Sequence, residues 1–545
     1  MRMFNRRNFL QLTGLTATAV LGGPALAACS TPPLPGLVPT DAEGVGSAFK
    51  PDLDLVLKAS ASEVALLPGS ATRVWTYAGS VVSGDPDAVQ AIPGSYLGPI
   101  IRVRRGQKVR VTFTNDLPGN GQASIIHWHG LQVPAAMDGH PRDAVQPGQS
   151  FIYEFEVTDR AGTYWFHPHP HRLTAQQVVA GLAGLFIVSD DEADRVTLPS
   201  GDYDLPMVIQ DRVFDGDNQF AYSPDMMTAM MGYLGNRLLV NGQPDLSLPV
   251  ATRAYRLRML NGSNARIYKL AWSDGTPLTV IGTDDGLLDA PIERPYVMLS
   301  PGERLEVWAD LRNRAVGDEL RLISQTFTGV EGVGSAGGMM GGGMMGGGMM
   351  GGMMSGGAAQ GTELQLATLR VERQEAETLS LPSALTSITR HRLADAVNAD
   401  APRRVIITQR NMTWKLNGRD FDMMAVADDE KVKAGTLEVW EIVNDVNPGE
   451  MMDPLGMAHP FHFHGVQFQV VSRSLSTDYP EFAIGYATVS EGLVDEGWKD
   501  TVLIMPGETV QLLMRFPNNP GVYVYHCHNL EHADNGMMRN YAIGA

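Results

Sequence analysis

The tripeptide His526-Cys527-His528, followed by His532 and Met537, constrains the chain more than any other feature of its sequence. A cysteine thiolate, imidazoles and a weak methionine thioether form the ligand set of a mononuclear blue-copper centre. Successive side chains of a β-strand point to opposite faces, so the two histidines point away from the face of Cys527. They can bind a second metal group that is joined to the first centre by a few covalent bonds. This arrangement indicates electron transfer from one metal site to another.

Ten of the 13 histidines of the chain fall into four clusters. The clusters are His127-Trp128-His129-Gly130, His167-Pro168-His169, His459-Pro460-Phe461-His462-Phe463-His464-Gly465, and His526-Cys527-His528 with His532. Two histidines separated by one residue on a strand lie on the same side and can hold neighbouring metal ions. A single pair is as readily explained by surface histidines, but four clusters with a cysteine and a methionine favour metal binding.

These clusters resemble the motifs of the multicopper oxidases, in particular the three-domain bacterial laccase-like and cuprous oxidases, from about residue 53 to the C-terminus. The resemblance implies four copper ions, one of type 1, one of type 2 and two of type 3. Type 1 copper would be bound by His459, Cys527 and His532, with Met537 as axial ligand. Type 2 copper would be bound by His127 and His462. The type 3 ions would be bound by His129, His167 and His528, and by His169, His464 and His526.

Reduction of O₂ also requires protons, and the resemblance assigns Asp138 to the place of the family's acidic residue near the type 2 site. After His532 the family commonly has another acidic residue, but this chain has Ala533. We expect either that Glu531 or Asp534 substitutes for it through water, or that the reduction of O₂ is slower. The three remaining histidines, His140, His171 and His391, match no ligand position and are expected on the surface.

The rest of the sequence predicts an all-β protein of β-sandwich domains, and its three copies of one pattern resemble cupredoxin-like, Greek-key domains. Short segments rich in Val, Ile, Tyr and Phe alternate with polar residues between turn residues, as in β-sandwiches. A Pro-Gly turn before a strand recurs at Pro147, Pro301 and Pro506, each after an earlier strand that ends in asparagine. We place the domains at 53–190, 200–375 and 400–545. The second has no histidine between His171 and His391 and is expected to bind no copper.

The N-terminal residues 1–29 resemble a twin-arginine signal peptide, with Arg6-Arg7 before Phe9-Leu10 and a short apolar stretch. The end of this segment resembles a lipobox, which would attach lipid to Cys29, whereas cleavage after Ala27 is the alternative. Residues 30–52 would be a linker. We therefore expect a periplasmic or cell-envelope protein, without a transmembrane span in its mature form. A net charge of −18 makes nucleic acid an improbable partner.

A Gly/Met segment at residues 331–361 is expected to form a loop inserted in a hairpin of the second domain. Its methionines are Met339, Met340, Met344, Met345, Met349, Met350, Met353 and Met354. Thioethers are soft ligands that suit Cu(I), although a repeat without function is the alternative. Met451, Met452, Asp453 and Met457, which precede or flank the type 1 region, are further candidates for binding substrate Cu(I), and core packing is equally compatible with any one of them.

We expect an exported monomeric oxidase that couples one-electron oxidation of Cu(I), phenols or aromatic amines to four-electron reduction of O₂ to water. Its role would be copper tolerance. A laccase that acts mainly on organic phenols is the alternative within the family. A copper-sequestering binding protein and a structural envelope protein that has lost copper are alternatives of other classes, and the full ligand set argues against both.

Overall fold

The computed structural model describes residues 49–119, 122–331, 358–410, 413–445, 456–478 and 480–544. Cys29, the eight methionines of the Gly/Met segment, Met451, Met452 and Asp453 lie outside these ranges. Strands dominate the described residues, as the sequence predicts, and they form six sheets. None of the helices in the described ranges is long and apolar enough to cross a membrane.

The first β-sandwich has a four-stranded sheet in the order β2-β1-β5-β7 and a five-stranded sheet in the order β3-β4-β9-β8-β6. Alternate residues of β1 and β5 are buried, and their apolar positions face the core that the two sheets enclose, whereas β6 and β8 are buried throughout. The strands are β1 (Leu53–Val64), β2 (Thr72–Ser83), β3 (Val89–Gln90), β4 (Ile100–Arg104), β5 (Lys108–Asp116), β6 (Ile126–His129), β7 (Ser150–Glu156), β8 (Gly162–Pro168) and β9 (Gly184–Ser189).

The second β-sandwich has sheets in the orders β12-β11-β10-β14-β19-β16-β17 and β13-β21-β20-β15-β18. Strands β20 and β21 pair with each other on either side of the Gly/Met segment. The strands are β10 (Asp204–Arg212), β11 (Arg237–Val240), β12 (Gln243–Pro244), β13 (Leu246–Ala251), β14 (Ala254–Asn261), β15 (Tyr268–Trp272), β16 (Leu278–Thr283), β17 (Gly286–Arg294), β18 (Val297–Leu299), β19 (Arg304–Asp310), β20 (Glu319–Ser324) and β21 (Leu364–Arg373).

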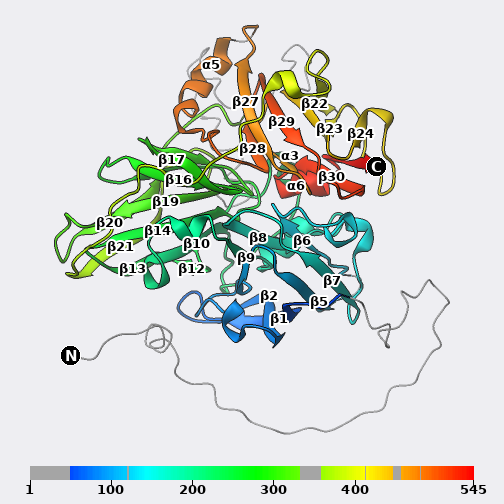
Figure 1. Ribbon diagram of the computed structural model, residues 1–545. Helices are drawn as coiled ribbons and strands as arrows, with labels where there is room; N and C mark the ends of the chain where they lie inside the picture. The colour runs from blue at the N-terminus through cyan, green and yellow to red at the C-terminus, as the bar shows by residue number, and fades with distance from the viewer. Residues whose placement is uncertain are drawn as a thin grey trace, which may run out of the picture.

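The third β-sandwich has sheets in the orders β23-β22-β25-β29-β27 and β24-β31-β30-β26-β28. In Figure 1 its orange and red strands face the cyan strands of the first sandwich, and the green second sandwich lies beside both. The strands are β22 (Arg403–Arg410), β23 (Thr413–Leu416), β24 (Lys431–Lys433), β25 (Leu437–Asn444), β26 (His459–Phe463), β27 (Phe468–Leu475), β28 (Thr501–Ile504), β29 (Glu508–Arg515), β30 (Gly521–Cys527) and β31 (Met538–Gly544).

The repeated Pro-Gly turn has the same hydrogen bonds in all three sandwiches. The amides of Gly148, Gly302 and Gly507 donate to the backbone carbonyls of Asn115, Asn261 and Asn444, at 2.7, 2.9 and 3.1 Å. Each glycine has a φ between 70° and 89°, a conformation that favours glycine over residues with a Cβ. The three copies therefore share one local geometry, as expected of a repeated domain.

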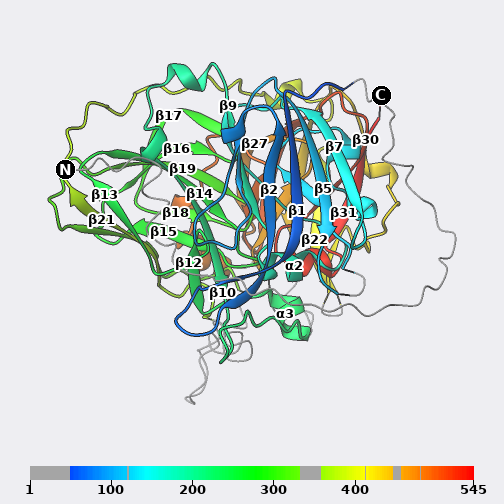
Figure 2. The same cartoon turned by 90° about the horizontal axis from the view of Figure 1, so that it is seen from below.

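Short helices connect the strands, and Figure 2 shows two of them, α2 (Thr174–Ala180) and α3 (Met226–Met231), near each other on one side of the molecule. The α-helices are α2 (Thr174–Ala180), α3 (Met226–Met231), α5 (Pro480–Ala487) and α6 (Leu530–Asp534). The 3-10 helices are η1 (Pro86–Ala88), η2 (Ala135–Met137), η3 (Pro141–Asp143), η4 (Ala193–Arg195), η5 (Gly201–Tyr203), η7 (Leu393–Asp395), η8 (Asp428–Glu430) and η9 (Ser490–Gly492).

Candidate metal centres

The histidine clusters of the first and third sandwiches occupy equivalent strand pairs. In the first sandwich β6 pairs with β8, so that His127 lies opposite His167. In the third sandwich β26 pairs with β30, so that His462 lies opposite His526 and Phe461 opposite Cys527. Because side chains alternate along a strand, Trp128 and Cys527 enter the cores of their own domains while the flanking histidines point outward.

Cys527 lies between two histidines that come from different parts of the third sandwich. Its Sγ is 3.5 Å from Nδ1 of His459 and 3.6 Å from Nδ1 of His532. Met537 is fully buried in the same core cluster, and its backbone carbonyl accepts a hydrogen bond from the Cys527 amide. Two imidazole nitrogens and the cysteine sulfur at these distances can surround one ion.

The outer edge of this centre is covered by helix α3. Nε2 of His532 donates to the backbone carbonyl of Met230 at 2.7 Å, and Nε1 of Trp414 donates to the same carbonyl at 3.1 Å. The Trp414 ring also lies across His459, with ring centroids 4.4 Å apart. His532 is consequently only 1% exposed, and its Nε2 contacts the backbone of α3 rather than solvent. The sequence did not identify Trp414 or Met230 because both are distant in the chain from the ligands.

The other eight clustered histidines converge in one buried cage between the first and third sandwiches. His127 stacks on His464 with ring centroids 3.5 Å apart, and His129 stacks on His462 at 3.8 Å. The cage contains groups of three whose ligand atoms lie within 4.8 Å of one another. They include His129 with His167 and His528, His169 with His464 and His526, and His127 with His129 and His462.

The nitrogen atoms in this cage fit metal binding. Nε2 of His127 and of His462 are 3.3 Å apart, and Nε2 of His526 is 3.3 Å from that of His169 and 3.2 Å from that of His464. Two basic nitrogens cannot satisfy each other at such distances without a proton or a cation between them.

Several ring nitrogens of the cage are also buried without a hydrogen-bond partner. This is expected of nitrogen atoms whose role is to bind a metal ion. They are Nε2 of His167, both ring nitrogens of His528, Nδ1 of His129 and Nδ1 of His169. Burial and the neighbouring histidines hold the pKa values of His129, His167, His169, His464, His526 and His528 well below the ordinary value. These imidazoles are therefore neutral and able to ligate a metal at neutral pH.

Two buried carboxylates orient the cage. Oδ2 of Asp138 accepts a hydrogen bond from Nδ1 of His464 at 2.8 Å, and Oδ1 is 3.5 Å from Nδ1 of His127. Burial raises the pKa of Asp138. Asp500, which the sequence did not identify, lies with Oδ1 3.0 Å from Nε2 of His129 and binds the Arg304 guanidinium. The sequence signal for Asp500 was limited to a charged pair, Lys499-Asp500, before an apolar strand.

The acidic residues beside Ala533 are anchored to neighbouring elements. Asp534 accepts hydrogen bonds from the amides of Thr174 and Ala175 at the start of α2, and burial raises its pKa to about 8. Glu531 accepts from the Tyr233 amide at 3.0 Å and from Asn264 Nδ2 at 2.8 Å. Burial also raises the pKa of Glu531. Both side chains are thus available to hold protons, but within the described part of the chain neither forms a hydrogen bond with a histidine of the cage.

The prediction that His140 lies on the surface is wrong. His140 is fully buried, because its ring links η3 to strand β31. Nδ1 accepts from the Arg142 amide and Nε2 lies 3.1 Å from Oδ1 of Asn540. Burial lowers its pKa to about 4. His171 and His391 are partly buried against Phe421 and Trp498, respectively.

Of the methionines proposed for the substrate site near His459, Met457 is buried in the core of the third sandwich, which favours its packing role.

The two ends of the Gly/Met segment lie close to the cysteine centre. The carbonyl of Val330 accepts from the amide of Ala458, the residue before His459. At the other end, the Ala358 amide donates to the carbonyl of Gly235, which follows α3 in the chain. The carbonyl of Ala358 also accepts from Arg266 at 2.7 Å. The chain therefore leaves and re-enters the described structure beside the elements that carry or cover His459 and His532.

Comparison with known proteins agrees with this arrangement. Family models described as multicopper oxidase match residues 71–193 and 396–545. The multicopper oxidase mco of Staphylococcus aureus is 30% identical over 447 residues, covering 82% of this chain and 81% of that protein. The cell division protein FtsP of Photorhabdus laumondii is 30% identical over 542 residues, 98% of each chain. The solved structure of the McoA multicopper oxidase from Aquifex aeolicus is similar with a TM-score of 0.72 and 31% identity, covering 91% of this chain and 97% of that chain. The chain therefore belongs to the multicopper oxidase family of copper-dependent oxidoreductases.

Proposed function

We propose that this protein is an oxidase with four copper ions that couples one-electron oxidation of Cu(I), and also of phenols or aromatic amines, to reduction of O₂ to water. The observation that carries the proposal is the complete ligand set, in which Cys527 is flanked by two histidines of the buried cage. A protein that merely sequesters copper needs no such cage. A structural envelope protein that has lost copper would not need the cysteine with its two imidazole neighbours.

We assign the type 1 ligands to His459, Cys527 and His532 with Met537, and the type 2 ligands to His127 and His462. His129, His167 and His528 form one type 3 set, and His169, His464 and His526 form the other. Copper, when bound, supplies the one-electron acceptor and the four-electron reduction of O₂. The chain itself aligns the two centres, since His526 and His528 are covalent neighbours of Cys527.

Buried carboxylates orient the ligating histidines and supply protons. Asp138 fixes the tautomer of His464 through its 2.8 Å contact with Nδ1, which leaves Nε2 for the metal. Asp500 similarly holds Nε2 of His129 and leaves the unpartnered Nδ1 as the donor atom. We assign proton supply to Asp138, and, in place of the acid absent at Ala533, to Asp534 or Glu531 through water.

The methionine thioethers of α3 and of the Gly/Met segment favour cuprous ion as the reductant. Helix α3 exposes Met226 and Met227, at 67% and 38%, on the element whose Met230 carbonyl accepts from His532. The Gly/Met segment starts and ends beside the same centre. Soft sulfur ligands bind Cu(I) in preference to hard cations, so they would raise its concentration where electrons enter. We propose copper tolerance as the physiological role of a monomeric protein in the periplasm or cell envelope after twin-arginine export. Lipidation at Cys29 and cleavage after Ala27 are the two alternatives for the end of the signal segment.

The test is steady-state oxygen uptake with Cu(I) and with a phenol as alternative reductants. The comparison is between the natural chain, a chain lacking residues 337–357 and a chain in which the eight segment methionines are replaced by leucine. The two variants keep Val330 and Ala358, so the anchored ends are undisturbed. We expect both variants to oxidise Cu(I) more slowly and to oxidise the phenol as fast as the natural chain or faster.

Equal loss of both activities would make the segment structural and remove its role with Cu(I). Unchanged Cu(I) kinetics in both variants would assign the segment to a repeat without function. Absence of oxygen uptake with either reductant in the copper-loaded natural chain would refute the oxidase proposal itself, in favour of sequestration or an envelope role.

A further inference from the structure

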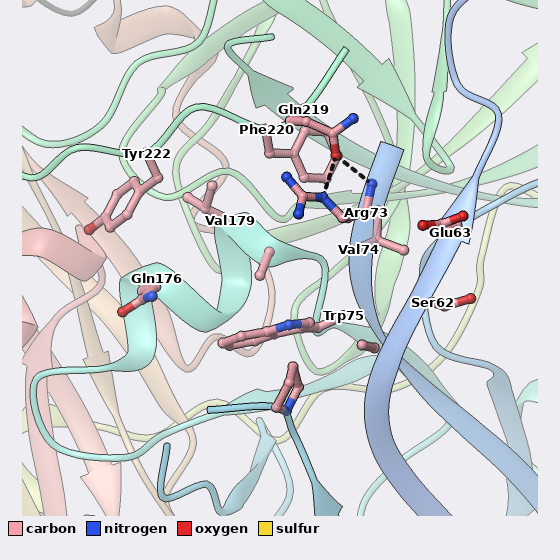
Figure 3. Close-up of a pocket in the computed structure, with 13 residues that line it drawn as sticks. Ser62, Glu63, Arg73, Val74, Trp75, Gln176, Val179, Gln219, Phe220 and Tyr222 are labelled. Carbon is pink, nitrogen blue, oxygen red and sulfur yellow. Dashed lines mark hydrogen bonds between the residues drawn. The ribbon is translucent and has the colours of Figure 1, made fainter. Parts of the chain in front are cut away.

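A pocket of about 590 Å³ opens where the first sandwich meets the segment that follows β10. Aromatic rings line it on different sides: Figure 3 shows the Trp75 indole across the pocket from the rings of Phe220 and Tyr222. Val179 of α2 adds an apolar surface, and Gln176 and Arg73 add polar groups. This volume and this mixture of apolar walls with a few polar groups are typical of small-molecule sites.

The back of the pocket is connected to the type 1 centre through Tyr222. The Tyr222 hydroxyl donates to Oε1 of Glu531 at 3.3 Å, and Glu531 directly precedes the ligand His532 in α6. The Tyr222 ring also packs edge-on against Tyr233 at 5.5 Å, and the Tyr233 amide donates to the other oxygen of Glu531. One side chain thus separates the pocket from the helix that carries His532.

A bulky donor has no direct contact with the type 1 imidazoles. His459 and His532 are buried, and the outward nitrogen of His532 is already bonded to the Met230 carbonyl. A small cation that binds thioethers could react at α3, whereas a planar aromatic molecule needs a surface on which its ring can stack. The pocket at Trp75 provides that surface beside α2, which packs against α6.

We propose that this pocket binds the aromatic reductant, a phenol or aromatic amine, and that Tyr222 connects it to the type 1 site. The inference rests on the proposed oxidase function and adds an entry route separate from that of Cu(I). A bound phenol loses one electron to the type 1 site and its hydroxyl proton to solvent at the open mouth, which leaves a phenoxyl radical. Trp75 and Phe220 stack with the ring, and Tyr222 is a positioning residue for electron transfer.

Binding is measured first, without turnover. Calorimetry of 2,6-dimethoxyphenol with the copper-loaded enzyme, reduced and kept free of oxygen, reports affinity alone. Loss of the Trp75 ring in Trp75→Ala should weaken binding about tenfold, as expected for a ring that stacks and is shielded from water. Gln176 is exposed on α2, so Gln176→Trp should fill the pocket and block binding without disturbing the core. Gln365→Trp on the exposed face of β21 is the matched control.

Turnover then separates binding from electron transfer. Gln176→Trp should raise KM for the phenol and leave Cu(I) oxidation unchanged. Tyr222→Phe should lower kcat for the phenol more than the rate of Cu(I) oxidation, with KM for the phenol unchanged and an intact visible type 1 band. Tyr203→Phe, which removes a hydroxyl bonded to Glu375 far from α6, is its control.

Natural affinity and KM in both Gln176→Trp and Trp75→Ala would overturn the proposal while leaving the oxidase function in place. Equal loss of Cu(I) and phenol oxidation in Tyr222→Phe would overturn the separate route, because it would show that Tyr222 supports the type 1 site as a whole. If the natural enzyme oxidises neither reductant, the underlying oxidase proposal fails instead, and that outcome is distinct from both others.

Discussion

Replacing Asp500 by asparagine should destabilise the protein strongly even when no copper is bound. Asp500 is fully buried, and its two oxygens bind Nη1 and Nη2 of Arg304 at 2.8 and 2.5 Å. Its Oδ1 also accepts from the Thr501 hydroxyl and lies next to His129. Asparagine has nearly the same shape but no charge, so the variant isolates the ion pair.

The expected magnitude follows from the environment of Arg304. Removing one partner of a buried ion pair costs about 3–5 kcal/mol, because the other charge is left buried and uncompensated. Asp284 and Asp285 remain within 3.8 and 3.5 Å of the Arg304 guanidinium and compensate part of its charge. We therefore expect a loss of about 3 kcal/mol in the free energy of unfolding, at the lower end of that range.

Urea unfolding of the copper-free protein at pH 7, followed by tryptophan fluorescence, measures this loss. Asp289→Asn is the matched control, since Asp289 pairs with Arg390 on the surface and exposed pairs contribute about 0–1 kcal/mol. The direction in which this stabilisation changes with pH also follows from the structure. Burial would raise the pKa of Asp500, but Arg304 and His129 outweigh it and hold the pKa well below the ordinary value. The stabilisation is therefore present above the unfolded pKa and is lost only as the pH falls through the folded one. A cost of Asp500→Asn no larger than that of Asp289→Asn would refute the reasoning.

Four further outcomes are expected. Cys527→Ser should abolish the blue absorption of the copper-loaded protein and its oxidase turnover while circular dichroism stays unchanged; a blue, active variant would contradict the type 1 assignment. His462→Ala and His169→Ala should each stop O₂ reduction while the type 1 colour is still bleached by substrate in stopped-flow measurements, because these side chains belong to the cage alone. Asp138→Asn should slow O₂ reduction about 10²–10⁴-fold with little effect on type 1 reduction, and unchanged turnover from pH 5 to 8 would move proton supply to Asp534 or Glu531. Asp159→Asn should remove a pH-dependent loss of stability, because burial raises the pKa of Asp159 to about 7. The natural protein therefore loses stability as the pH rises from the unfolded pKa towards that value. A variant whose unfolding midpoint has the same dependence on pH as the natural protein would exclude this cause.

The juxtaposition of the candidate metal ligands could be predicted from the sequence because their geometry is local. In His127-Trp128-His129 and His526-Cys527-His528, strand alternation alone decides which side chains share a face. The repeated asparagine and Pro-Gly turn likewise express short-range backbone requirements, which the structure meets in all three sandwiches. The all-β fold with three cupredoxin-like domains follows from the same local patterns.

The residues that the sequence missed act through contacts between distant segments. Met230 and His532 are 302 positions apart, and His129 and Asp500 are 371 positions apart. No periodicity relates such pairs, because the docking of whole domains creates the contacts. His140 was misplaced for the same reason, since its burial depends on Asn540 in the last strand.

The second sandwich has a larger part in the site than its lack of histidines suggests. Its Arg304 holds Asp500 against the cage, and its Asn264 and the Tyr233 amide hold Glu531 in the helix of His532. Both contacts attach the third sandwich to the second near proposed copper ligands. Asp500 is one hydrogen bond from His129, and Glu531 directly precedes His532 in the chain. A domain without ligands can therefore set the orientation of ligands in its neighbour. Substitutions at Arg304 or Asn264 should then alter the proposed metal centres, although neither residue is a proposed ligand.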